Sequence, residues 1–176
     1  MARLEIPLNI LAVTTIVLMV TANAAPKWYE MDQAQTSAGI EVGIWRVCVT
    51  TDVRRCKSSL KDSDLLNVNH TLRNTQAFVV MAVLLASTTT VLIIFMEFNK
   101  KKPKWIGLPR FLFAASAFCM FIAALSFVGY VEEENLGDRP DPKYGASFVL
   151  AWISIGTAMG AALVAHFHHT TMAQGR

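Results

Sequence analysis

Four long apolar runs limit what this chain can fold into. They extend over about Ile6–Ala25, Thr75–Met96, Phe111–Val131 and Gly145–Ala165, and none contains an ionisable residue away from its ends. A helix needs about 20 mostly apolar residues to cross a bilayer. The runs therefore predict four transmembrane helices, all within a single domain that covers residues 1–176.

The composition agrees with an integral membrane protein and excludes other classes. Of the 176 residues, 53% are hydrophobic and only 16% are charged, whereas a soluble domain is about 25% charged. Disordered chains have the opposite composition, poor in apolar residues and rich in charge. The net charge of +3 is small, and the basic residues of the chain are divided between the loops. We therefore expect no nucleic-acid partner.

The first run has an alternative interpretation as a signal peptide. Ala22-Asn23-Ala24 has the small-x-small form of a cleavage site. Against this, the run is long for the apolar part of a signal peptide, and Glu5 balances Arg3 before it. We favour a retained helix.

The loop charges predict the orientation. The segment Glu97–Arg110 is basic, so the positive-inside rule makes it cytoplasmic, together with both termini. Its basic residues are Lys100, Lys101, Lys102, Lys104 and Arg110. The segments Pro26–Asn74 and Glu132–Tyr144 then become outer loops of a plasma-membrane protein.

The first outer loop carries a predicted disulfide between Cys48 and Cys56. The stretch Glu41–Thr50 mixes apolar, aromatic and β-branched residues in rough alternation, as a strand does, and Asp52 marks a turn. Outside the cell the two thiols should be oxidised. Free thiols are a weaker alternative, and zinc is weaker still because His70 alone would complement them.

Two tryptophans belong to the same loop. Trp28 directly follows the first run, where an aromatic-belt residue at the membrane interface explains it adequately. Trp45 lies in mid-loop, three residues before Cys48, and we expect it to pack on the disulfide and to start a small core.

In this order the residues resemble the claudin signature W–GLW–C–C–R. The matching positions are Trp28, Gly43, Ile44, Trp45, Cys48, Cys56 and Arg73, with Ile44 in place of the usual Leu. The signature is shared by claudins, epithelial membrane proteins, peripheral myelin protein and the calcium-channel gamma subunits. Two further stretches are similar to epithelial membrane proteins, Thr71–Phe78 and Tyr144–Trp152.

The resemblance implies a fold and a mode of action. The fold is mainly α, a left-handed four-helix transmembrane bundle with a small extracellular antiparallel β-sheet. The first outer loop would supply most strands and the start of the second would supply one. In claudins, residues near the second cysteine line a paracellular pore, which here implies Asp52, Arg54, Arg55 and Lys57, a net basic set. The hypothesis is anion preference, and the alternative is ordinary solvated charges.

The resemblance leaves three functions open. The first is a junction or membrane-contact protein that assembles with itself or with a related four-helix protein at cell–cell junctions. The second is an auxiliary subunit of a larger channel or receptor, or a regulator like the epithelial membrane proteins. The short second outer loop favours this second possibility, but the better motif match keeps the first slightly ahead. The third and weakest is a lipid enzyme, for which no catalytic motif is visible.

Several other residues have an ordinary structural interpretation beside a more specific functional one. Asn69-His70-Thr71 is a glycosylation sequon close to the second helix. Gly156 and Gly160 are spaced for close helix packing, which we expect within the bundle rather than in a homodimer. Cys119 should be a packing residue. The histidines His166, His168 and His169 lack the further ligands of a metal site. We predict a non-enzyme without cofactor or metal, in contact with membrane lipid.

Overall fold

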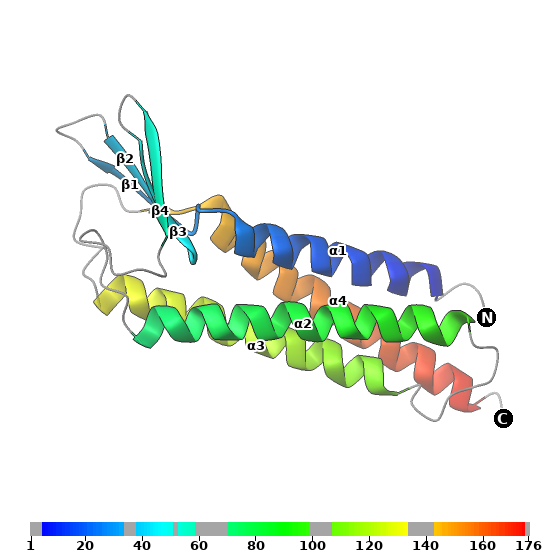
Figure 1. Ribbon diagram of the computed structural model, residues 1–176. Coiled ribbons are helices and arrows are strands. Elements are labelled where there is room, and N and C mark those ends of the chain that lie inside the picture. Colours follow the sequence, from blue (N-terminus) through cyan, green and yellow to red (C-terminus); the bar gives the residue numbers. More distant parts are fainter. Residues whose placement is uncertain are drawn as a thin grey trace.

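The computed structural model describes residues 5–33, 38–50, 53–58, 70–98, 107–133 and 143–174. Four helices lie side by side, and a small sheet stands at one end of them (Figure 1). The helices are α1 (Glu5–Ala24), α2 (His70–Phe98), α3 (Leu108–Glu133) and α4 (Ala146–Gln174). The start of α1, the end of α2, the start of α3 and the end of α4 all lie opposite the sheet (Figure 1).

All four helices are long and apolar enough to cross a membrane. With the antiparallel sheet, this confirms the predicted fold class of a mainly α membrane protein. Three helices are longer than the apolar runs, since α2 begins at His70 rather than near Thr75 and α4 continues to Gln174 rather than Ala165. At about 1.5 Å per residue, helices of 26 and 29 residues exceed the roughly 30 Å hydrocarbon layer. Their extra turns therefore reach into the interfacial layers.

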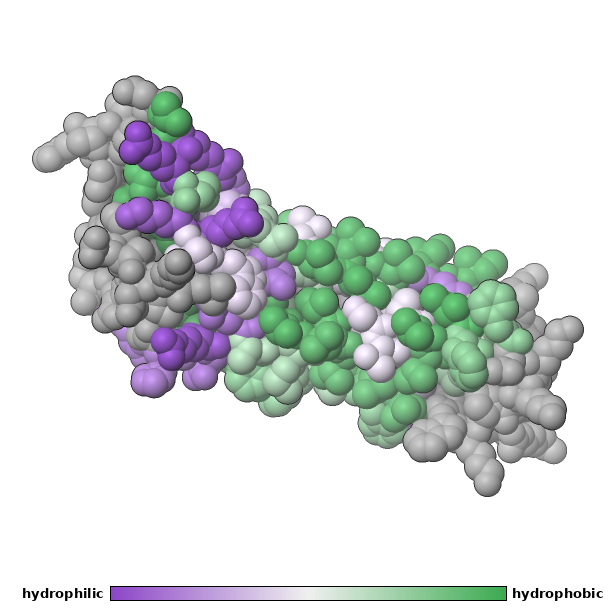
Figure 2. Space-filling view, in the orientation of Figure 1, coloured by the Kyte–Doolittle hydropathy of each residue, from purple (hydrophilic) through white to green (hydrophobic). Residues whose placement is uncertain are grey.

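The interior of the bundle is built from small side chains. Fully buried alanines line the contacts between helices at Ala12, Ala22, Ala82, Ala86, Ala123, Ala124, Ala151, Ala158 and Ala161. Small residues let helix backbones approach closely, and that is how helices associate in a lipid solvent. Larger apolar side chains such as Ile10, Leu84 and Phe118 point outward. Figure 2 shows this apolar surface over the helices and polar residues at the sheet end.

One polar contact joins three helices in the interior. The Ser116 hydroxyl on α3 donates to the Ala82 carbonyl on α2 at 2.7 Å and lies 3.6 Å from the Met19 sulfur on α1. The buried threonines Thr15 and Thr90 donate to carbonyls four residues earlier in their own helices. These hydroxyls are therefore hydrogen-bonded although no water reaches them.

The sheet has five antiparallel strands in the order β4-β3-β2-β1-β5. They are β1 (Tyr29–Gln33), β2 (Ala38–Val42), β3 (Arg46–Thr50), β4 (Arg54–Ser58) and β5 (Lys143–Tyr144). Two expectations need correction. The stretch Glu41–Thr50 is not one strand, because the chain turns at residues 43–45 and returns as β3. The strand from the second loop comes from the end of that loop, beside α4, and not from its start.

Candidate functional site

The pairing register divides the sheet into an apolar and a polar face. Tyr29, Val42 and Val47 lie in one row across the strands, and this row ends at Lys57 on β4. The three apolar members are buried in one cluster with side chains from the helices. Side chains alternate between the two faces along each strand. Glu30, Glu41, Cys48 and Cys56 therefore share the opposite face.

Trp28 joins the sheet to the helices. Its side chain is 0% exposed, packs edge-on against Phe127 at 4.9 Å and Phe148 at 5.8 Å between ring centroids, and donates from Nε1 to the Ala22 carbonyl at 2.6 Å. The acceptor lies in the last turn of α1, whose carbonyls have no partner within the helix. The expectation of an aromatic-belt residue at the interface is therefore wrong. Trp28 is a core residue.

The turn of residues 43–45 makes the second connection. Ile44 is buried, and its carbonyl accepts a hydrogen bond from the Gln76 side chain of α2 at 2.9 Å. The Trp45 ring nitrogen donates to the Asn23 side chain of α1. We expected Trp45 to pack on the disulfide, but the observed contacts join it to the helices. Cleavage after Ala24 would remove the acceptors of both tryptophans.

Two glycines allow backbones to touch where the sheet contacts the helices, a region called the sheet–helix junction below. A Cβ on Gly43 would lie 2.6 Å from the Pro26 Cα, and one on Gly145 would overlap the Lys27 carbonyl. Both neighbours are backbone atoms, which cannot move aside as a flexible side chain can. The Gly43 amide donates to the Arg46 carbonyl at 2.8 Å, and the Gly145 amide donates to the Trp28 carbonyl at 3.0 Å. The glycine of the signature is therefore explained by close backbone approach.

The predicted disulfide is present. Cys48 and Cys56 are directly opposite each other on β3 and β4, with 4.0 Å between their Cα atoms. Cys48 is fully buried, whereas Cys56 and the rest of β4 are exposed. The bond therefore ties an exposed edge strand to a buried one. Cys119 is a free cysteine, buried in α3.

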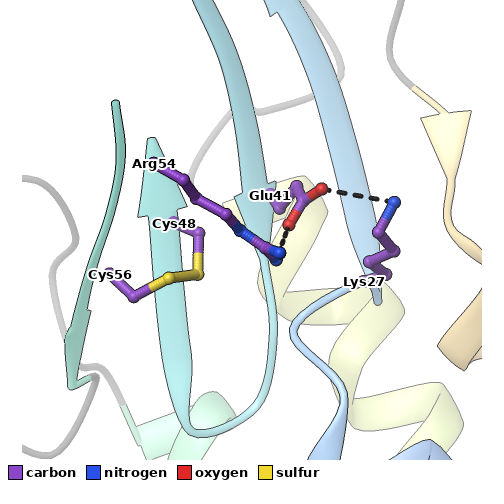
Figure 3. Close-up of a disulfide and its surroundings, with 5 residues drawn as sticks. All are labelled: Lys27, Glu41, Cys48, Arg54 and Cys56. Atoms are coloured by element: carbon purple, nitrogen blue, oxygen red, sulfur yellow. Dashed lines mark hydrogen bonds and ion pairs between the residues drawn. A yellow bond between two sulfur atoms is a disulfide. The ribbon is translucent and has the colours of Figure 1, made fainter. Parts of the chain in front are cut away.

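An ion-pair network covers the polar face beside the disulfide. Glu41 lies between Lys27, 3.2 Å away, and Arg54, with which it forms a hydrogen-bonded pair (Figure 3). The hydrogen bond to Glu41, its negative charge and that of Glu30 raise the pKa of Lys27. This interaction favours the folded state below the ordinary pKa of a lysine and is lost as the pH rises through the raised value. Arg54 pairs with the same Glu41 carboxylate, and its positive charge is compensated within a network that also contains Glu30.

The other proposed selectivity residues lie elsewhere. Arg55 and Lys57 follow each other on the opposite face of β4, and both side chains are exposed. Within the part of the chain that the structure describes, neither forms an ion pair. Asp52 and the sequon residue Asn69 lie outside the described residues. Arg73 is exposed on α2, and nothing in the structure explains why the signature has an arginine there.

Gly156 and Gly160 do not pack inside the bundle. A Cβ added to either would meet nothing within 4 Å. The expectation of close packing within the bundle is therefore wrong for both. They belong to an outward face of α4, between the exposed side chains of Ile153, Met159 and Leu163.

Metal-ligating side chains do not gather in the described residues, where no group of three His, Cys, Asp or Glu could hold a metal ion. His166 instead contacts Arg110, and the ring of His169 lies near Gly107.

A protein-family model matches most of the sequence. The model of the PMP-22/EMP/MP20/Claudin family covers residues 4–163, from the start of α1 to within α4. The chain belongs to the PMP-22/EMP/MP20/Claudin family. No curated protein sequence matches the chain.

Most residues of the family's signature lie at the sheet–helix junction. Sequence reasoning nevertheless missed four residues of this family member that hold the sheet: Asn23, Glu41, Gln76 and Gly145. Gln76 offered one signal, since it is an amide side chain at the start of an apolar run. Glu41 offered none, because its partners are distant in sequence.

Proposed function

We propose that this family member is a non-catalytic junction or membrane-contact protein that acts through its sheet, outside the cell. The observation that carries the proposal is the contrast across the sheet. Four separate contacts hold the inner strands to the helices, through Trp28, Trp45, Gln76 and Gly145. The outer strand β4 is exposed throughout. A sheet whose inner strands are held to the helices and whose edge strand is exposed is suited to contact with another molecule.

The charge on that edge supports selection between ions. Because Glu41 neutralises Arg54, the uncompensated positive charge of β4 comes from Arg55 and Lys57. They are two residues apart on one face of a strand. Like charges at close quarters attract counter-ions and repel ions of their own sign. The proposed preference is therefore for anions, and it rests on these two residues rather than on Arg54.

A dilution-potential measurement in epithelial monolayers that express the chain tests this proposal. Arg55→Asp and Lys57→Asp should each lower the chloride-to-sodium permeability ratio. Arg46→Asp is the matched control, because Arg46 is exposed on the opposite face of the same sheet. If all three variants leave the ratio unchanged at equal surface expression, ion selection by this edge is excluded.

A second candidate, an auxiliary subunit of a larger membrane protein, is favoured by one observation. Gly156 and Gly160 leave a shallow apolar face on α4 that nothing among the described residues covers. Small residues at such spacing permit close approach of a second helix. Co-purification of a large partner in mild detergent at fixed stoichiometry, lost in Gly156→Leu but retained in Leu84→Ala on the outside of α2, would favour this candidate over the first.

A further inference from the structure

A basic cluster lies at the end of the bundle opposite the sheet. Arg110 is the third residue of α3, and its Nη1 donates to Nδ1 of His166 on α4 at 3.1 Å. A carbon placed on Gly107 would lie 3.4 Å from the ring of His169 and 3.8 Å from Nε of Arg110. The Arg110 guanidinium and the His169 ring therefore border the small space left by the missing side chain of Gly107, here called the niche, and His166 adjoins the same guanidinium.

The Arg110 guanidinium is only partly satisfied within the chain. Its Nε is shielded from solvent and has no hydrogen-bond partner among the described residues. Arginine carries five N–H donors and no acceptor. The ion pairs of the described residues join Lys27, Glu30, Glu41 and Arg54, all at the sheet end. The cluster thus carries positive charge and holds a buried, unused donor beside the niche.

Helix geometry places the niche at the level of lipid headgroups. His166 follows the start of α4 by 20 residues, or about 30 Å at 1.5 Å per residue. This equals the thickness of the hydrocarbon layer. Arg110, within the first turn of α3, lies at the same end. Both residues are therefore close to the layer in which lipid phosphates lie.

The surroundings of the cluster distinguish a lipid from a free anion. Phe111, whose ring lies 4.6 Å below the Arg110 guanidinium, is 62% exposed. Phe167, beside His166, is 60% exposed. The niche is therefore continuous with an apolar surface that faces the membrane. A phospholipid would bring its phosphate to the cations and its acyl chains to the two phenylalanines, whereas a free phosphate would use only the cations.

We propose that this niche binds the headgroup of an anionic phospholipid. The phosphate accepts hydrogen bonds from Arg110 and lies against the imidazoles of His166 and His169 above Gly107. The four lysines Lys100, Lys101, Lys102 and Lys104 precede Gly107 in sequence and lie outside the described residues. The net positive charge selects anionic over zwitterionic headgroups. The binding is independent of the proposed junction function.

Native mass spectrometry of the purified full chain tests the proposal. Phosphatidylserine and phosphatidylcholine with identical acyl chains are titrated separately, and inorganic phosphate is added as a competitor. We expect one phosphatidylserine to bind at least tenfold more tightly than phosphatidylcholine. Arg110→Gln should weaken it about tenfold, since it removes charge-assisted hydrogen bonds to the phosphate. Arg46→Gln, the same change in charge at the sheet end, should have no effect.

A second variant keeps the test decisive if Arg110→Gln does not fold. Gly107→Val fills the niche without changing charge, and should also weaken phosphatidylserine about tenfold. The proposal is overturned if the two lipids bind equally, or if Gly107→Val binds normally. It is also overturned if millimolar inorganic phosphate displaces the lipid completely, or if replacing the four lysines by Gln abolishes binding that Arg110→Gln leaves intact.

Discussion

The inner and outer halves of the sheet are held by different means. The inner half consists of β1, β5 and the turn of residues 43–45, and its side chains and backbone are fixed to helix ends. The outer half, the β3–β4 hairpin, is joined to the rest by pairing of β3 with β2, by Val47 in the core cluster and by the ion pair of Arg54 with Glu41. The Cys48–Cys56 bond lies within this half and ties β4 to β3. Most signature residues therefore stabilise the fold, and the surface available for function lies largely outside the signature.

The largest effect should follow loss of Trp28. Trp28→Ala removes a fully buried ring and its hydrogen bond to α1, so we expect a cost of about 3–5 kcal/mol in the free energy of unfolding. Trp152→Ala is the matched control, because that ring is 40% exposed on the outside of α4. Thermal unfolding in detergent compares the two. Equal losses of stability would contradict the assignment of Trp28 to the core of the sheet–helix junction.

Gly43 should come next. Gly43→Ala forces a methyl group against the backbone of Pro26, and we expect a loss of about 3 kcal/mol, at the upper end of overpacking effects. Gly39→Ala, in β2, places its methyl group in open space and should be neutral or slightly stabilising. Surface expression and the thermal midpoint report both. If Gly43→Ala behaves like Gly39→Ala, backbone contact does not explain the glycine of the signature.

Removal of the disulfide should cost less and act locally. Replacing Cys48 and Cys56 by Ala is expected to cost about 2–3 kcal/mol, because the bond closes only a short loop. The damage should be confined to the hairpin, so the four helices stay folded by circular dichroism. Cys119→Ala, which removes a thiol but no cross-link, is the control. Loss of helical structure in the double variant would show that the hairpin also stabilises the bundle.

The smallest change in stability is expected at Glu41. Its partners are largely exposed, and exposed ion pairs contribute only about 0–1 kcal/mol. Glu41→Gln should therefore leave the thermal midpoint nearly unchanged. It also frees Arg54, which lies on the face opposite Arg55 and Lys57, so the chloride-to-sodium permeability ratio should stay unchanged. A large fall in the midpoint would mean that the network supports the fold.

The sequence predicted the parts of this fold that depend on short-range patterns. Hydropathy located the four helices, because each is a continuous apolar run. The short spacing of Cys48 and Cys56, with the turn residue Asp52 between them, predicted the paired cysteines of the hairpin. Both features arise from neighbouring residues.

The features that were mispredicted depend on contacts between distant segments. Trp28 follows a membrane helix, as a belt residue does, yet it is buried by α3 and α4. The break at Gly43 occurs inside a strand-like pattern because the chain must pass close to Pro26. The spacing of Gly156 and Gly160 fits packing on any helix, and only the assembled bundle shows that they face outward. Burial and backbone proximity of this kind are not encoded in local periodicity.

Hydrogen–deuterium exchange of the intact protein tests the division of the sheet most directly. We predict slow exchange for the backbone amides of Tyr29 and Glu30, which have strands on both sides, and of Gly43, whose amide donates to the Arg46 carbonyl. Peptides that cover Arg54–Ser58 should exchange much faster, since that strand is exposed and paired on one side only. Uniformly slow exchange across all strands would contradict the account, because the outer half would then be as firmly held as the inner half.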